Sequence, residues 1–200
     1  MNIVLDYIFY YYFYSVVGWI LETVCCSIYY KKLMNRGFMK GPVVPIYGAG
    51  ALVLGVCLMP FYEKFGYTWY MIIIVMLLGV LLADFVEYMT SLIMEKLFHA
   101  RWWDYSNEKF NLHGRICLKH SVYWLLITFA FIYIIHPFVM QQKALLISDE
   151  KRDIIIIISS VIFVIDLIVT VILAKKKKMR NTVSSDNVPE CVKNRNENKK

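Results

Sequence analysis

The chain has 200 residues, 59% of them hydrophobic, with a formal net charge of +7 and a mean hydropathy of +0.52. This apolar share exceeds the roughly 45–50% of soluble globular domains, so the composition excludes an ordinary soluble protein and indicates an integral membrane protein. The positive charge lies in short segments beside apolar stretches. It is better explained by membrane topology or contact with anionic lipid than by nucleic acid, which we do not expect as a partner.

Five segments are apolar over the length of about 20 residues that a bilayer crossing requires. Each must be helical, because backbone amides in lipid need hydrogen-bond partners within their own segment. The sequence therefore predicts an all-α, polytopic transmembrane helix bundle within residues 1–174. In chain order, the expected spans are residues 7–30, 43–62, 67–94, 116–139 and 154–174.

Residues 175–200 differ from the rest of the chain. They begin with a basic run, are polar, and show no apolar period, which predicts a disordered cytoplasmic tail. Lys and Arg are also frequent in residues 31–40 and 96–115, whereas the other two loops carry few or balanced charges. Basic residues favour the cytoplasmic side of a membrane. We therefore expect a multi-pass protein of the cell membrane, with its N-terminus outside and its C-terminus in the cytoplasm.

Acidic residues inside the apolar spans are the strongest functional signal. An ionised side chain at that depth costs about 2.5–3.5 kcal/mol on insertion scales and usually faces a functional interior. Glu22 lies in the first span, and Asp84 and Glu87 share one face of the third as an i, i+3 pair. His120 enters from the same side on the fourth span. The sequence predicts an intramembrane polar site in the cytoplasmic half, formed by Glu22, Asp84, Glu87 and His120.

The cytoplasmic loops carry polar residues that could form the mouth of this site. The candidates are Arg36, Arg101, Asp104, His113 and Arg115. Acids within the membrane could carry protons or bind a cationic substrate, whereas the Arg and His residues would suit an anionic head group or phosphate.

Two points stay open at this stage. Glu22 could serve function or only fix helix register through a charged partner. Asp166 stands alone near the centre of the fifth span and could pair within the bundle or line a path.

The sequence contains no zinc-ligand spacing, P-loop, GxSxG or HExxH motif. We therefore predict no metal site, no cofactor and no ATP-binding loop within this chain.

Several short motifs occur in a fixed order between Phe13 and Trp124. They are Gly18–Thr23, Asn35–Phe38 with Gly41-Pro42, Pro45–Gly48, Glu87-Tyr88, Glu95–Phe98, Arg101–Ser106 and Asn111–Ile116. Together they resemble the CmpB-type ABC transporter permease family. The resemblance implies a membrane subunit driven by a separate ATPase. Besides the lipid bilayer and such an ATPase, a second copy of the chain is the other partner we expect. The Glu-Ala-Ala and Gly coupling motif of well-understood importer permeases is not found in this sequence.

Our first hypothesis is a permease-like transport component with an intramembrane acidic site. One alternative is an enzyme acting on a lipid or other amphiphile at the inner leaflet. In that case Glu87 with His113 or His120 would act as general acid and base, and Arg115 would hold an anionic group. The other alternative is a structural or regulatory membrane protein, in which charged residues pair to set helix register.

Overall fold

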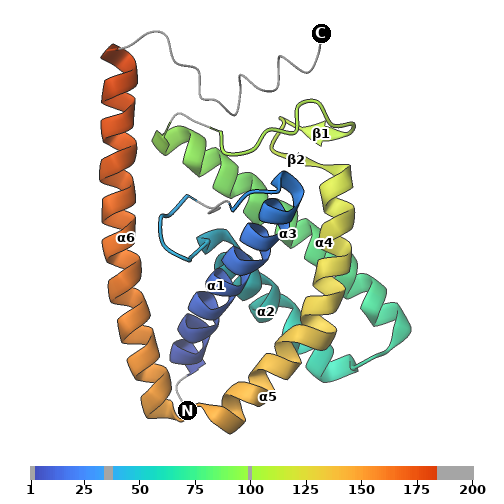
Figure 1. Ribbon diagram of the computed structural model, residues 1–200. Helices are drawn as coiled ribbons and strands as arrows, with labels where there is room; N and C mark the ends of the chain where they lie inside the picture. The colour runs from blue at the N-terminus through green and yellow to red at the C-terminus, as the bar shows by residue number, and fades with distance from the viewer. Residues whose placement is uncertain (1–2, 34–37, 99–100, 184–200) are drawn as a thin grey trace.

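The computed structural model describes residues 3–33, 38–98 and 101–183 (Figure 1). Its helices are α1 (Ile3–Tyr30), α2 (Pro45–Phe65), α3 (Trp69–Phe98), α4 (Leu118–Ala130), the π-helix η1 (Phe131–Ile135), α5 (His136–Leu146) and α6 (Asp149–Val183). A short antiparallel pair, β1 (Asn111–Leu112) and β2 (Ile116–Cys117), lies in the loop before α4. The protein is 81% helical, which confirms the predicted all-α fold.

Five helical stretches of the described chain are long and apolar enough to cross a membrane. They are Ile3–Tyr30, Pro45–Phe65, Trp69–Phe98, Leu118–Leu146 and Asp149–Leu173. The number of spans matches the prediction, and most boundaries differ by only a few residues. The fourth span continues seven residues beyond the expected end at residue 139, because η1 and α5 extend α4 without a break. The direction of the chain across the membrane remains a prediction.

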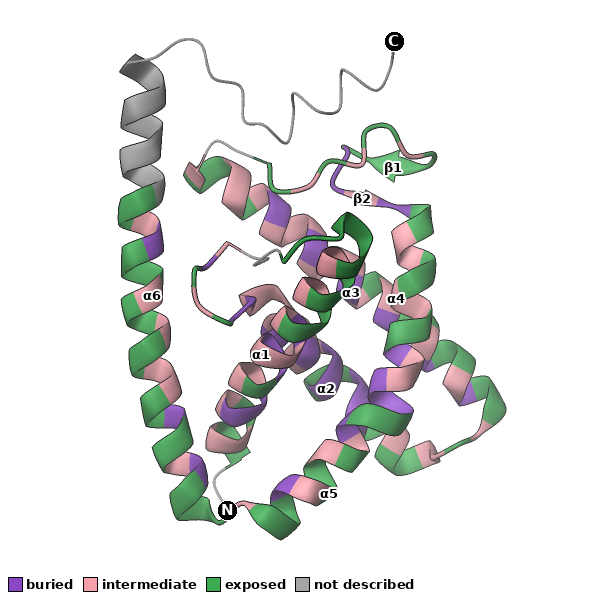
Figure 2. Cartoon of the chain, viewed as in Figure 1, coloured by how far each residue is buried: buried purple, intermediate pink, exposed green. Residues whose placement is uncertain are grey.

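The centre of the bundle lies where α1, α2 and η1 meet. At this crossing, the ring of Tyr47 on α2 occupies the space that a side chain at Gly18 would fill, and Ser15 lies directly against Gly48. Small residues let two helices approach closely where lipid supplies no hydrophobic force between them. α6 contacts α1 through a 3.0 Å hydrogen bond from the Tyr12 hydroxyl to Ser160. Much of the α6 surface is exposed in the isolated chain, as expected for a lipid-facing helix (Figure 2).

The segment from Phe38 to Val44 runs back into the bundle before α2 begins. Its start is level with the end of α3, because the rings of Phe38 and Phe98 lie 4.7 Å apart. Its end is fixed by a 3.0 Å bond from the Val44 amide to the Ser15 carbonyl. Ser15 lies about 22 Å along α1 from the end of that helix at Tyr30. Non-helical backbone therefore lies beside the middle of a membrane-spanning helix.

Such backbone is tolerated at membrane depth only where its polar groups are satisfied by protein or water. Asp166 on α6 supplies one partner, since its Oδ2 accepts a 2.9 Å hydrogen bond from the Gly41 amide. Thr170, one turn further on, lies within 3.5 Å of the other Asp166 oxygen. Of the two possibilities that the sequence left open for Asp166, the structure shows a pairing within the bundle.

Candidate functional site

The buried residues of α3 form a stripe that repeats every fourth position and carries Glu87 into the bundle. The stripe comprises Met71, Val75, Gly79, Ala83, Glu87 and Ser91. Glu87 is only 7% exposed. Its Oε2 accepts a 2.9 Å hydrogen bond from the indole of Trp124 on α4, and its Oε1 accepts a 3.1 Å bond from the Tyr105 hydroxyl. Among the described residues, no Lys, Arg or His forms an ion pair with Glu87.

Asp84 lies one turn before Glu87 on the same face of α3. Its Oδ2 accepts a 2.7 Å hydrogen bond from the Ser121 hydroxyl of α4. Its Oδ1 is buried and, within the described part of the chain, has no hydrogen-bond partner. Asp84 therefore retains an unused acceptor, and it too lacks an ion pair with any described cation.

Tyr47, at the start of α2, connects this pair of acids to α1. It lies close enough to Glu22 and Glu87 to interact electrostatically with both carboxylates. We call Glu22, Asp84 and Glu87, together with Tyr47, Tyr105, Ser121 and Trp124, the acidic cluster. The cluster thus draws on α1, α2, α3, α4 and the loop before α4.

His120 lies at the edge of the acidic cluster. Its ring stacks on Tyr105 with centroids 4.3 Å apart and an angle of 23° between the planes. Its Nδ1 lies 3.1 Å from the sulfur of Cys117. The structure therefore brings all four residues of the predicted intramembrane site into one region, with His120 linked to the carboxylates through the Tyr105 ring.

Tyr105 is held in its protonated form. Burial, and then the negative charge of the adjacent Glu87 carboxylate, raise the pKa of Tyr105 above its ordinary value. Its hydroxyl is consequently a hydrogen-bond donor at any physiological pH. A neutral donor of this kind fixes the position of the Glu87 carboxylate without neutralising its charge.

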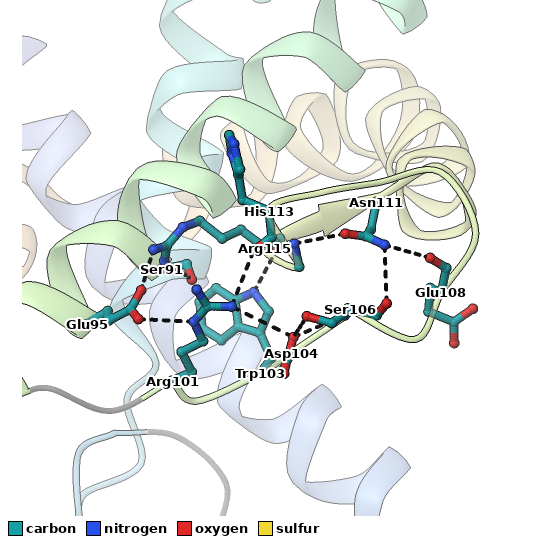
Figure 3. Close-up of polar contacts among 11 residues, drawn as sticks. Ser91, Glu95, Arg101, Trp103, Asp104, Ser106, Glu108, Asn111, His113 and Arg115 are labelled. Carbon is teal, nitrogen blue, oxygen red and sulfur yellow. Dashed lines mark hydrogen bonds and ion pairs between the residues drawn. The ribbon is translucent and has the colours of Figure 1, made fainter.

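The loop formed by residues 101–117 is attached to α3 through Glu95. Arg101 donates a 3.1 Å bond from its Nε to Glu95, and Arg115 pairs with the other carboxylate oxygen (Figure 3). Arg115 also donates to the Ser91 hydroxyl at 3.0 Å and is 7% exposed. These two guanidinium groups are thereby occupied by protein partners.

Other polar residues of the same loop bond to its own backbone. The Trp103 indole donates to the Arg115 carbonyl at 3.0 Å, and Asp104 accepts bonds from the amide and hydroxyl of Ser106. Gly114 has a φ of 68°, a conformation that L side chains rarely adopt, and a Cβ there would overlap Ser106 and Asp104. The loop before α4 is therefore a specifically folded unit.

The predicted mouth residues have the following places. Arg101, Asp104 and Arg115 lie together in this network, and the ring of His113 bonds through Nδ1 to the Tyr88 hydroxyl at 3.0 Å. Arg101 also donates to the His113 carbonyl at 3.2 Å. Arg36 lies outside the described residues. Whether these residues form the mouth of a site is a prediction that the geometry leaves untested.

Sequence reasoning missed four side chains of the acidic cluster. Ser121 and Trp124 could have been found, because with His120 and Thr128 they form a polar face at i, i+4 spacing along an apolar helix. Tyr47 and Tyr105 carried no such signal, since Tyr47 is a single polar-tipped ring in the first turn of α2 and Tyr105 lies in the loop before α4. Within the described chain, no three His, Cys, Asp or Glu side chains converge as a metal site.

Comparison with known families gives one match. The family model described as "Putative ABC-transporter type IV" matches residues 9–171, and the chain belongs to this family. The matched stretch is longer than the resemblance expected over residues 13–124 and includes most of α6, which the expected range left out. No curated protein and no solved structure matches the chain. Family and fold together fit a membrane transport component.

Proposed function

We propose that this chain is the permease-like membrane subunit of a transport system and that the acidic cluster binds protons or a cation during transport. The observation that carries this proposal is the absence of a described cationic partner for Asp84 and Glu87, although both lie within a membrane-spanning helix. Two carboxylates one turn apart on one helix face favour protonation or cation binding over a doubly charged state.

Two other acids of the spanning helices, Asp6 on α1 and Glu95 on α3, provide a contrast. Asp6 accepts a 2.6 Å bond from Lys143 and a 2.9 Å bond from Arg152, and Glu95 pairs with two arginines. A carboxylate paired in this way has a structural explanation. Within the described part of the chain, Asp84 and Glu87 are instead held by neutral donors, which leaves their charge available to a proton or a cation.

A transport subunit of this family also needs a source of energy. The sequence contains no P-loop, so we propose that a separate ATPase subunit drives it. We further place the protein in the cell membrane with its N-terminus outside, which puts the acidic cluster in the cytoplasmic half. Arg101 and Arg115 both pair with Glu95, which favours a structural role for these two arginines. This is the part of the protein for which we adopt the structural hypothesis.

Carbodiimide labelling tests the acidic cluster without knowledge of the transported substrate. Dicyclohexylcarbodiimide partitions into membranes and reacts with protonated carboxyl groups. The purified full chain in lipid nanodiscs should gain label at Glu87 or Asp84, located by peptide mass spectrometry, and Glu87→Gln should remove the Glu87 label. If the label is lost when the pH rises and added cations have no effect, the cluster binds protons. If Na⁺, K⁺ or Mg²⁺ protects the carboxyl groups at fixed pH, the cluster is a cation site.

Glu95→Gln serves as the matched control, because it removes an acid of the same helix whose charge is already paired. Glu87 should still be labelled in this variant. Absence of label at both Asp84 and Glu87 across the whole pH range would contradict the proposal.

A further inference from the structure

The fourth span contains a buried histidine directly after a π-helical segment. Residues Phe131–Ile135 form η1, and His136 follows at the start of α5 with an exposure of 5%. A π-helical insertion shifts the faces of the helix that follows, and such insertions concentrate at functional sites. The shift presents an ionisable side chain to the interior of the bundle. An ionisable group inside a membrane span is by default a candidate functional residue.

His136 is held by a tyrosine and enclosed by aromatic rings. The Tyr14 hydroxyl lies 2.8 Å from its Nδ1. The ring centroids of Tyr10, Tyr14 and Phe131 lie 5.1, 5.7 and 5.2 Å from the centroid of the imidazole. The faces of aromatic rings attract cations at such distances, most strongly away from water. These rings would interact favourably with an imidazolium and offset part of the cost of charging a buried ring.

The charged and titratable groups near His136 belong to few elements. α1 contributes Tyr10 and Tyr14, and η1 contributes only the Phe131 ring. α2 contributes Gly55, where an added Cβ would lie 3.7 Å from Nε2 of the imidazole. None of the described ion pairs includes His136.

An ion-pair cluster joins the start of α1, the second half of α5 and the start of α6. It comprises Asp6, Lys143, Asp149, Arg152 and Asp153, so its carboxylates outnumber its cations by one. Lys143 and His136 are seven residues apart, about 10 Å along α5. The net negative charge of this cluster would attract protons to this end of the bundle, from which His136 is reached along α5.

We propose that His136 and Tyr14 form a second proton-binding site, separate from the acidic cluster. In the neutral state Tyr14 donates its hydroxyl hydrogen to Nδ1. When a proton from the aqueous phase binds at Nδ1, the ring gains one positive charge and the Tyr14 oxygen becomes the acceptor. Tyr14 lies eight residues before Glu22, about 12 Å along α1, so the two sites occupy different depths.

Nitrogen-15 NMR of the full chain labelled at histidine, in nanodiscs, tests this inference directly. The chain has four histidines, and the His136 signals are identified by their loss in His136→Gln. They should move from neutral toward cationic shifts as the pH falls from about 8 to about 3, because imidazole groups titrate on the acidic side of neutrality. Tyr14→Phe should lower the midpoint of this titration, because a charge-assisted bond to the imidazolium is lost.

Tyr88→Phe is the matched control. Tyr88 bonds to His113 Nδ1 at 3.0 Å in the same way, but at an exposed position. This change should alter the His113 signals and leave those of His136 unchanged. His136 signals that stay neutral over the whole range, in a folded wild-type chain, would overturn the proposal. Because the readout does not involve Glu87, its failure is distinguishable from failure of the acidic cluster as a transport site.

Discussion

Thr128 of α4 packs directly onto Gly79 of α3, and its side chain occupies the space that a Cβ at Gly79 would need. Gly79→Ala should therefore force α3 and α4 apart and lower the free energy of unfolding by about 1–3 kcal/mol. The measurement is unfolding in mixed micelles with increasing denaturing detergent. Gly50→Ala is the control, since nothing lies within 4 Å of a Cβ there, and it should be neutral or slightly stabilising. Equal effects of the two changes would show that the contact does not limit helix packing.

Glu95 and Glu87 should respond differently to amidation. Glu95→Gln leaves the buried Arg115 without its ionic partner, so it should lower the thermal unfolding midpoint. Glu87→Gln removes no described ion pair and keeps an oxygen that can accept from Tyr105 or Trp124. It should leave the midpoint close to that of the wild type while abolishing carbodiimide labelling at this position. A larger stability loss for Glu87→Gln than for Glu95→Gln would refute this assignment of roles.

Asp166 should stabilise the segment that runs back into the bundle. Asp166→Leu removes the acceptor of the part-buried Gly41 amide, and a donor left unsatisfied away from water costs up to about 1–3 kcal/mol. Asp166→Asn retains a carbonyl oxygen and should lose less. Stability to denaturing detergent and the rate of proteolysis between residues 38 and 44 report the effect. Wild-type proteolysis in the leucine variant would indicate that other contacts hold the segment.

The raised pKa of Tyr105 predicts a loss of stability at alkaline pH. In the unfolded chain a tyrosine ionises near pH 10, whereas the folded chain keeps Tyr105 neutral above that pH. The contribution of this group is thus fully present below about pH 10 and falls as pH rises through the folded-state pKa. Tyr105→Phe should flatten the decline in thermal stability above about pH 10. Identical slopes in the wild type and Tyr105→Phe would contradict the prediction.

The direction of the chain across the membrane can be tested with maleimides. In one variant all native cysteines are replaced by serine and Ser148→Cys, between α5 and α6, is added; this cysteine should react in intact cells with a membrane-impermeant maleimide. In a second variant Cys191 of the C-terminal tail is the single cysteine retained, and it should react only after the membrane is made permeable. The opposite pattern would reverse the orientation and move the acidic cluster to the outer half of the membrane.

The sequence was sufficient to predict the spans, because a bilayer imposes a minimum length of apolar residues and forces them to be helical. It also placed Asp84 and Glu87 on one face, since that follows from helical period alone. The register of the fourth span could not be predicted. Its π-helical turn leaves no mark in the pattern, and for this reason His136 was overlooked among apolar neighbours.

The contacts made by irregular segments could not be predicted from the sequence either. Tyr105 bonds to Glu87 only because the folded loop returns over α3, and this return depends on Arg101 and Arg115 meeting Glu95. The arginines were interpreted as ligands for an anion because a sequence shows charge but does not show which partner satisfies it.

The bond between Gly41 and Asp166 joins residues 125 positions apart. During synthesis, the early hairpin of α1 and α2 enters the bilayer well before the ribosome has made α6. Until then the Gly41 amide lacks its final acceptor, and the backbone around it cannot settle beside Ser15 with all its polar groups satisfied. Completion of this bundle is therefore a late event in biogenesis, and a nascent chain released before α6 would expose an unfinished region to membrane proteases.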